Sequence, residues 1–319
     1  VFERSFNKLS EAGRTVFLMV ANWRSNVPEI GLIVVLGVRG IDAVAGLEEC
    51  TRLSLVYLLE VEGGQIFYSV PQLGRGFAQK KLQGDPDRLV IQQDLATLQK
   101  FGVVSGIPVG EDIESRLIAQ FTKACFDDIG KGAEETQRAD KLLEGLANSW
   151  APGWRVLADF RRRSSADVAA VGYALRRAVE EEPFSKDAWI DRANYARDIG
   201  DEAVQIASLV SAVDADPNDV GLVKEAAFLL CRYVSDHVAD IPKARRGVYL
   251  ASVRSHMQRV AGKLDATGLS RLAWLFLLEE NITKAREYAN KGCEIESTNG
   301  YCLRILERLD GQTSGAFEG

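Results

Sequence analysis

The sequence lacks the features that mark membrane spans and disulfide frameworks. No stretch approaches the roughly 18 uninterrupted apolar residues that a membrane helix needs. The longest apolar run, Ile30 to Val38, is short and contains glycines. The five cysteines include no CxxC pair and leave one over, which is typical of reduced core thiols. We therefore expect a cytoplasmic protein that does not contact a membrane.

Chemical motifs are equally scarce. There are two histidines, His237 and His256, which lie 19 positions apart without a ligand-spaced partner. The sequence contains neither a GxSxG nucleophile turn nor a GxxxxGKS/T phosphate loop. We therefore expect this chain to be no enzyme, and to hold no catalytic residue, no metal and no cofactor.

Basic residues are fewer than acidic ones, with 39 Lys and Arg against 45 Asp and Glu. The formal net charge of -6 and the pI of about 5.3 argue against broad contact with nucleic acid, which rewards clustered cations. An apolar fraction of 46% over 319 residues is ample for two or three packed domains. The first residue is Val1 and a helical pattern starts almost at once, so we expect a piece of a longer polypeptide.

The first 84 residues predict a winged helix. Pro28 and Asp42 are typical of helix starts, and Glu62-Gly63-Gly64 is typical of a hairpin turn. Three helices, a hairpin and a trailing helix are expected at 6–22, at 28–37, from Asp42 to Leu53, at 55–61 with 65–70, and at 72–82. We assign residues 1–84 to this domain.

Residues 85–149 are expected to form a helical linker. Asp85-Pro86-Asp87 interrupts the chain before predicted helices at 88–101, 112–128 and 134–148. Between the first two helices lies a glycine-rich stretch that also contains Pro108. Because glycine permits large backbone changes, we expect a hinge at Gly102, Gly106 and Gly110.

From residue 150 onward the sequence repeats with a period of about 34. Pro183 and Pro217 lie 34 positions apart, as do Ala178 and Ala212, whereas Trp154 and Trp189 lie 35 apart. Such a period predicts a solenoid, in which helix pairs stack because one pair cannot bury its apolar face alone. The frame is interrupted by longer helices at 220–236 and 242–263 and returns at 266–299. We assign residues 150–310 to the repeats and residues 311–319 to a disordered tail.

The repeats place small residues where two helices cross. Ala273, Ala285, Ala289 and Gly292 recur within the repeat at 266–299, and helices approach to about 8–10 Å only over such side chains. Here the sequence resembles the tetratricopeptide repeat family over roughly residues 150–309. It departs from that pattern where Ser297 stands in the place of the usual proline.

We expect the repeats to bind a protein or peptide ligand on a concave face. Large aromatic residues and basic residues of the repeats are the candidates for this contact. Arg161 and its neighbours form one of two basic clusters, which are expected either as exposed helix ends or as a docking point for an acidic partner. The predicted partner-binding residues are Trp154, Arg161, Arg162, Trp189, Tyr195, Arg197 and Trp274.

The order of winged helix, linker and repeats resembles the C-terminal part of STAND-type signalling NTPases, which include NB-ARC and NACHT proteins. The stretches Thr51 to Val56 and Tyr68 to Ala78 carry the resemblance. It implies a role in signalling or bacterial defence, an upstream NTPase domain as a possible partner, and ATP or ADP bound only there. The sequence departs from the family where Pro71 occupies the position of a histidine that often contacts phosphate, because a proline side chain cannot donate a hydrogen bond to phosphate.

Two alternatives stay open. A winged helix also serves transcription regulators by placing its third helix in the DNA major groove. That predicted helix carries Glu48 and Glu49 against a single cation, Arg52, so its exposed face is expected to repel phosphate. The other alternative is a passive interaction scaffold without a switch.

Overall fold

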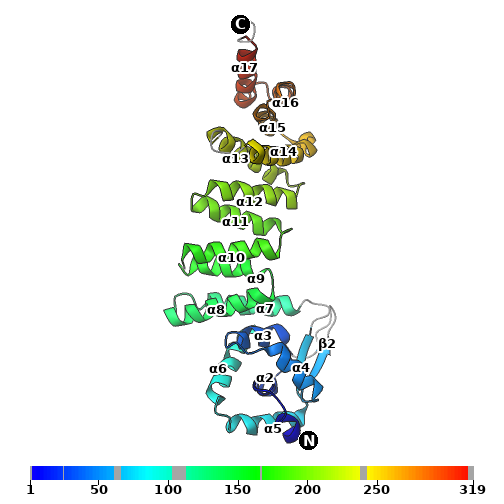
Figure 1. Ribbon diagram of the computed structural model, residues 1–319, viewed down its shortest axis with the longest axis vertical. Helices are drawn as coiled ribbons and strands as arrows, with labels where there is room; N and C mark the ends of the chain where they lie inside the picture. The colour runs from blue at the N-terminus through cyan, green and yellow to red at the C-terminus, as the bar shows by residue number, and fades with distance from the viewer. Residues whose placement is uncertain are drawn as a thin grey trace. The chain divides into compact units, whose positions relative to one another are not determined.

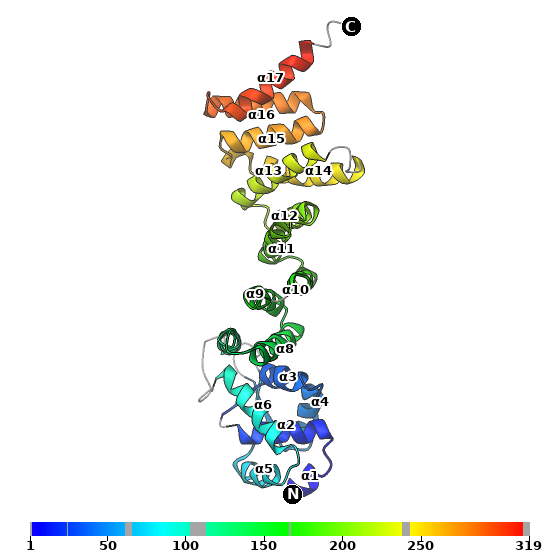
Figure 2. The ribbon, with the colours of Figure 1, turned by 90° about the vertical axis from the view of Figure 1, so that its left-hand side faces the viewer.

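In a computed structural model the chain is mainly helical with a small three-stranded sheet (Figures 1 and 2). The structure describes residues 2–23, 25–60, 66–102, 113–165, 167–237 and 243–314, without the side chains of 243–245 and 312–314. The chain divides into two compact units, unit 1 (Val1–Ala174) and unit 2 (Leu175–Gly319). This division rests on compactness, so the domain boundaries expected from the sequence stay predictions.

Unit 1 holds the sheet and the helices of the first half of the chain. Its helices are α1 (Phe2–Phe6), α2 (Glu11–Asn22), α3 (Glu29–Gly37), α4 (Ala43–Arg52), α5 (Gln72–Gln83), α6 (Arg88–Leu98), the 3-10 turn η1 (Gln99–Phe101), α7 (Ile113–Phe126), α8 (Ala133–Ser149), α9 (Gly153–Arg163) and the start of α10 (Val168–Glu181). Most of these agree with the expected ranges to within one to three residues.

The expected helix at 6–22 is wrong at its start, because α1 ends at Phe6 and residues 7–10 separate it from α2. Ser10 caps the start of α2, and its side chain accepts a hydrogen bond from the Gly13 amide at 3.1 Å. The backbone amide and hydroxyl of Ser10 also donate to Glu49 on α4, at 3.0 and 2.7 Å. An N-cap residue lies outside the helix that it starts, so α1 cannot run on into α2.

The sheet has one strand more than the expected hairpin. β2 (Tyr57–Glu60) and β3 (Ile66–Ser69) pair antiparallel as expected, and β1 (Val27–Pro28) pairs with the other edge of β3, giving the order β1-β3-β2. The sequence indicated Pro28 only as the start of α3, and two residues are too few to show a strand period. The expected turn at 62–64 lies outside the described residues.

Helix α2 is the centre of the unit 1 core. Val16, Phe17 and Met19 are fully buried, and α2 packs against α4, α5 and α6 (Figure 1). Helix α3 is apolar on all sides and is covered in turn by α8 and α6, as expected for a helix without a polar face. The helices of the expected linker therefore pack directly on the N-terminal helices.

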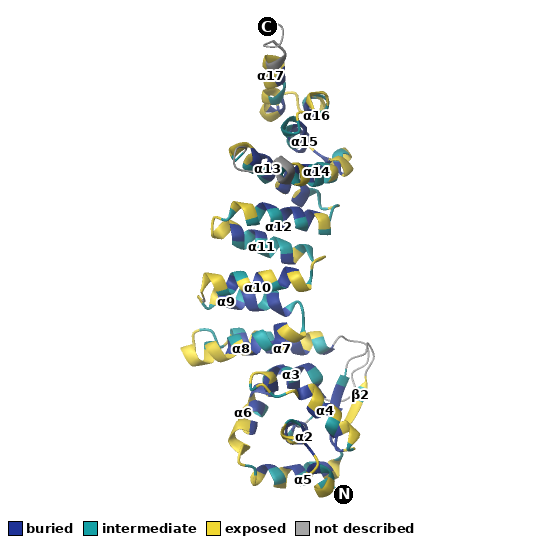
Figure 3. Cartoon of the chain, viewed as in Figure 1, coloured by how far each residue is buried: buried dark blue, intermediate teal, exposed yellow. Residues whose placement is uncertain are grey.

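Unit 2 consists of consecutive helices that pack in pairs. After the end of α10 they are α11 (Lys186–Asp198), α12 (Glu202–Ala215), α13 (Val220–Asp236), α14 (Lys243–Arg259), the 3-10 turn η2 (Ala261–Lys263), α15 (Ala266–Leu278), α16 (Ile282–Ile295) and α17 (Gly300–Ser314). The closest pairs are α11 with α12 and α15 with α16. Figure 3 shows buried and exposed residues sharing each of these helices.

Short polar turns connect the helices of unit 2. Gly200, between α11 and α12, has φ +76°, a backbone conformation that side chains disfavour. At the next corner Lys186 binds Asp216 and Asp219 at 2.8 and 3.1 Å. Asp219 also caps α13 by accepting from the Leu222 amide at 3.0 Å. Lys186 thus connects the start of α11 to the start of α13.

Small residues lie at the helix crossings of unit 2, as the sequence predicts. Ala273, Ala285 and Ala289 are completely buried. At Gly292 an added Cβ would lie 2.3 Å from Cys302 Sγ and 3.3 Å from the Ala266 carbonyl oxygen. Because only glycine fits there, α15, α16 and α17 can approach one another closely.

The last helix is longer than expected. We expected it to end at Leu309 and to be followed by a disordered tail at 311–319. Instead α17 continues to Ser314, so the expectation is wrong for residues 311–314. Small polar residues lower helix propensity without breaking a helix, and no proline occurs in this stretch. Residues 315–319 lie outside the described residues.

Candidate functional site

The candidate site is a groove of about 520 Å³ in unit 2. We call it the arginine groove. Alternate helices line it, and its described lining residues are Phe228 and Ser235 on α13; Thr267, Ser270, Arg271, Trp274 and Leu277 on α15; and Tyr301, Arg304, Ile305 and Arg308 on α17. Since α15 packs against both α13 and α17, it forms the middle of the groove.

The spacing of the lining residues follows helix geometry. Each helix contributes residues three, four or seven positions apart, which share one face. The α15 and α17 residues also lie in the 34-residue frame: Thr267 and Tyr301 are 34 apart, as are Ser270 and Arg304, and Trp274 and Arg308. The groove is therefore built from equivalent positions of successive helix pairs.

The groove is positively charged although the chain is acidic. Its described lining contains three arginines and no carboxylate, in a chain of net charge -6. Within the part of the chain that the structure describes, Arg271, Arg304 and Arg308 form no ion pair with a carboxylate. Their charge is therefore not neutralised by a direct contact, and an anionic ligand is favoured.

Two of these arginines are held in place by neutral groups. Arg271 donates to the Lys224 carbonyl oxygen at 2.8 Å and lies 5.0 Å from the centre of the Phe228 ring. Arg304 donates to the Gly300 carbonyl oxygen at 3.0 Å and lies 5.1 Å from the centre of the Tyr301 ring. A guanidinium over an aromatic face is attracted by the ring quadrupole. Both cations are thus positioned without losing their charge.

The rest of the groove offers apolar and small polar surface. Trp274, Leu277 and Ile305 are partly exposed there. Ser270 is 4% exposed, and its hydroxyl donates to the Thr267 carbonyl oxygen at 2.7 Å. A large aromatic side chain beside arginines is typical of surfaces that bind other proteins.

Of the predicted partner-binding residues, the structure brings only Trp274 into this groove. Trp189, Tyr195 and Arg197 lie on α11, outside the groove lining. The Trp189 indole donates to the Pro183 carbonyl oxygen at 2.8 Å, and Arg197 is exposed beside Asp198. Their role in binding stays a prediction.

Trp154, Arg161 and Arg162 lie on α9 in unit 1. Trp154 is 2% exposed and packs edge-on against Tyr173, and Arg161 is 7% exposed. Arg162 is exposed. Side chains buried in this way present no surface to a partner, so this placement gives no support to the expected binding role of the first two.

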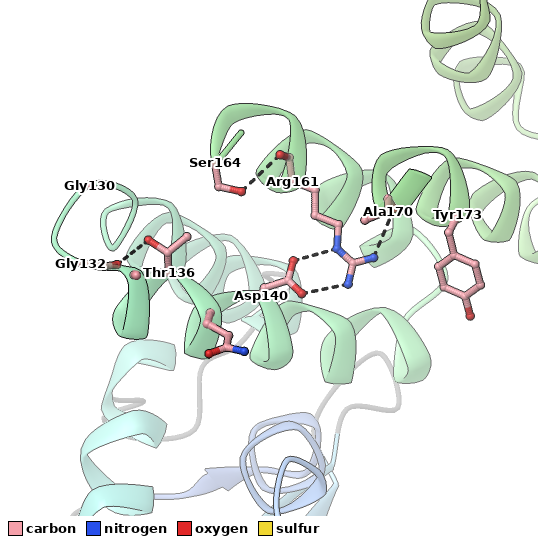
Figure 4. Close-up of a pocket in the computed structure, with 10 residues that line it drawn as sticks. Gly130, Gly132, Thr136, Asp140, Arg161, Ser164, Ala170 and Tyr173 are labelled. Atoms are coloured by element: carbon pink, nitrogen blue, oxygen red, sulfur yellow. Dashed lines mark hydrogen bonds and ion pairs between the residues drawn. The ribbon is translucent and has the colours of Figure 1, made fainter. Parts of the chain in front are cut away.

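Arg161 lines a second hollow, of about 640 Å³ (Figure 4). Its guanidinium binds both carboxylate oxygens of Asp140, at 2.8 and 2.9 Å, and its third donor reaches the Ala170 carbonyl oxygen at 3.4 Å. The Asp140 hydrogen bonds raise the pKa of Arg161, against the opposing effect of burial. Since its one lining cation is neutralised by its one lining carboxylate, this hollow attracts ions weakly.

The expected hinge is only partly described. Gly102 has φ +85°, and an added Cβ would lie 2.4 Å from Gln120 Oε1, so glycine is required there. Gly106 and Gly110 lie outside the described residues. Across this stretch Lys100 forms an ion pair with Asp128. The elements before and after the expected hinge are thus connected in this structure.

The third helix of the expected winged helix, α4, has an acidic face. Glu48 is exposed, and Glu49 accepts two hydrogen bonds from Ser10. These bonds hold the pKa of Glu49 below its usual value, so it stays ionised at neutral pH. A face with two carboxylates and one cation, Arg52, lines a shallow hollow that disfavours phosphate.

Catalytic and metal-binding arrangements are also sparse in the described part of the chain. No group of three or more His, Cys, Asp or Glu side chains there is arranged to hold a metal ion. The hydroxyl of Ser252 and Nε2 of His256 both contact Asp214 Oδ1, at 3.0 and 2.7 Å. Since serine and histidine share one carboxylate oxygen rather than forming a chain, they do not make a serine–histidine–aspartate relay.

Among the residues that the structure describes, no helix combines the length and apolar character needed to cross a membrane.

No protein-family model matches the chain, and no curated protein matches it. Among solved structures it is similar to a STAND protein with a tetratricopeptide repeat sensor from Pyrococcus horikoshii, described as a signal transduction ATPase with numerous domains. The two chains are 14% identical with a TM-score of 0.27, and the match covers 96% of this chain and 53% of that one. The present chain therefore spans about half the length of the Pyrococcus horikoshii protein.

Proposed function

We propose that the chain is the non-catalytic sensor region of a STAND-type signalling NTPase, and that it binds a protein or peptide ligand in the arginine groove. The groove carries this proposal: three unpaired arginines, three aromatic rings and no carboxylate lie together on alternate helices of unit 2. Such a surface suits recognition of a flexible chain rather than catalysis, because it contains no general base and no nucleophile within reach of one.

The helix pairs of unit 2 support a tetratricopeptide-like solenoid. Buried alanines and Gly292 lie at the crossings, and equivalent positions 34 residues apart line one groove. The small rotation from one repeat to the next gives a solenoid an extended concave surface. Helices α13, α15 and α17 all line the arginine groove, so a ligand there would contact several helix pairs at once.

In unit 1 we assign α2, α3, α4 and the β2–β3 hairpin to a winged helix that relays the signal. Its partner would be an NTPase domain that carries the ATP or ADP site, since this chain has no phosphate loop. A swing about residues 102–110 must separate α8 from α3. Ligand binding would therefore have to favour the state in which α8 and α3 are apart by a few kcal/mol.

A displayed peptide library tests the proposed function. We expect the full chain to select peptides, and we expect the variant Trp274→Ala to lose them while keeping its helical circular dichroism. Trp150→Ala is the matched control, because it removes a partly exposed tryptophan of unit 1, outside the groove. Selection of no peptide, or equal binding by both variants, would contradict the proposed function.

A further inference from the structure

We infer that the arginine groove binds an acidic peptide segment, with at least two carboxylates placed around an apolar side chain. This inference rests on the proposed function and adds the chemistry of the ligand. The reason is charge complementarity: the described lining offers three guanidinium groups and no carboxylate.

The neighbourhood of each arginine shows that its charge is available. Hydrogen bonds from Lys224, at 2.7 and 2.8 Å, are the main cause of the lowered pKa of Asp265, and the charge of Arg271 adds only a smaller effect on that carboxylate. Arg304 and Arg308 are exposed on α17. Among the described residues none of the three arginines forms an ion pair that would have to break before a ligand carboxylate can bind. The cost of binding is lower for groups that are already positioned.

The spacing of the two α17 arginines suits a particular ligand pattern. Arg304 and Arg308 are four residues apart, which places them about 6 Å apart along a helix axis. In an extended peptide alternate residues are about 6.6 Å apart and point to the same side. A segment lying along α17 can therefore present carboxylates at positions i and i+2 to these two guanidinium groups.

The same groove supplies apolar surface for a further side chain. Phe228, Trp274 and Ile305 are all partly exposed in its lining. An apolar side chain buried there contributes affinity, and the arginines fix its register through planar, bidentate contacts. Acidic residues alone would bind weakly, because an exposed ion pair contributes little free energy of binding.

A peptide fits these observations better than a nucleic acid does. A polyanion extends well beyond the groove and meets the field of a chain whose net charge is -6. A short peptide with a few carboxylates experiences mainly the local charge, because screening acts over about 8–10 Å in salt. Single-stranded nucleic acid is therefore the competing occupant that the test has to reject.

The test uses fluorescence anisotropy with the full chain and three labelled probes. The first is a synthetic peptide in which glutamates alternate with phenylalanines, the second is its glutamine twin, and the third is a single-stranded oligonucleotide. We expect the acidic peptide to bind about tenfold or more tighter than its twin, and its affinity to fall as salt is added.

Variants then locate the interaction. Removing both α17 cations, R304Q with R308Q, is expected to weaken the acidic peptide about tenfold or more and to leave the glutamine twin unaffected. The matched control, R88Q with R259Q, removes the same charge from exposed positions outside the groove and is expected to change neither. Circular dichroism checks the fold of each variant. Reversal of both charges, R304E with R308E, is expected to create affinity for a lysine–phenylalanine peptide.

Each alternative result has one meaning. If the acidic peptide and its glutamine twin bind equally and Trp274→Ala removes both, peptide binding stands and the inference about acidity is overturned. If neither peptide binds, both the inference and the proposed function fail. If the oligonucleotide binds in the groove and displaces the acidic peptide, the occupant is a nucleic acid and the inference is again overturned.

Discussion

The guanidinium of Arg161 on α9 binds both carboxylate oxygens of Asp140 on α8, at 2.8 and 2.9 Å. The arginine side chain is nearly buried, so its charge has lost most of its contact with water. Such a pair connects two helices, and its members depend on each other: a buried charge is costly once its partner is removed.

Asp140→Asn is therefore expected to destabilise the protein by about 3 kcal/mol. The carboxylate of Glu144 lies 3.6 Å from Arg161 and reduces the loss of stability, because it still offers the arginine a negative charge. Urea unfolding of both proteins gives the difference in free energy. The control is Asp198→Asn, which breaks an exposed pair with Arg197 and should cost under about 1 kcal/mol. Equal losses in the two variants would show that the Arg161–Asp140 pair is not special.

Gly292→Ala is expected to destabilise unit 2 by about 1–3 kcal/mol, because its new methyl group would lie 2.3 Å from Cys302 Sγ. Removing the sulfur should relieve the clash. The double variant, Gly292→Ala with Cys302→Ala, is thus expected to lose less stability than the two single variants together, as measured by denaturant unfolding. If the losses of stability in the two single variants simply add, these two residues are not in contact.

Much of the fold could be predicted from local features of the sequence. Pro28 and Asp42 precede helices as the sequence predicts, and the buried alanines follow the 34-residue frame. Strand β1 was missed because two residues give no period. The burial of Arg161 was missed because an arginine run at a helix end does not show which member has a carboxylate opposite it, 21 positions earlier in the chain.

The arginine groove was predicted only through Trp274. Tyr301, Arg304 and Arg308 could have been found, since they lie 34 positions after lining residues of α15. The α13 contribution could not be found in this way. Phe228 and Thr267 are 39 apart, because the α13–α14 pair is longer and breaks the frame.

The ion pair between Lys100 and Asp128 predicts a stability change in acid. Burial acts to raise the pKa of Asp128, but hydrogen bonds from Lys100 and Lys131 hold it below its usual value. A lowered pKa stabilises the fold above the ordinary aspartate pKa of about 3.9, and this stability is lost as the pH falls through the folded value.

Asp128→Asn is accordingly expected to cost about 1–2 kcal/mol at pH 7 and to become neutral in acid, below the folded pKa of Asp128. Urea unfolding across this range measures the change. The exposed neighbour provides a control, Asp127→Asn, which should have little effect at any pH. A penalty for Asp128→Asn that persists unchanged in acid would rule out the carboxylate as its cause.

The cysteines predict a simple pattern of thiol reactivity. Burial raises the pKa of Cys50 and of Cys125 to about 12 and that of Cys302 to about 11, and it also raises the pKa of the fully buried Cys231. The thiolate is the reactive form. The remaining thiol, Cys293, is partly exposed.

A thiol reagent at pH 8 is therefore expected to modify one cysteine per folded chain and all five in denaturant. Cys293→Ser should remove the fast reaction of the native protein. Rapid modification of a second thiol without denaturant would show that a buried cysteine is accessible.

The most direct test of the ligand site is photo-crosslinking with the acidic peptide, carrying a benzophenone in place of one phenylalanine, followed by mass spectrometry. Crosslinks to residues of α13, α15 and α17 are the predicted result, and they should disappear in the variant R304Q with R308Q. Crosslinks confined to α11 or to unit 1, and unchanged in that variant, would contradict a ligand site in the arginine groove.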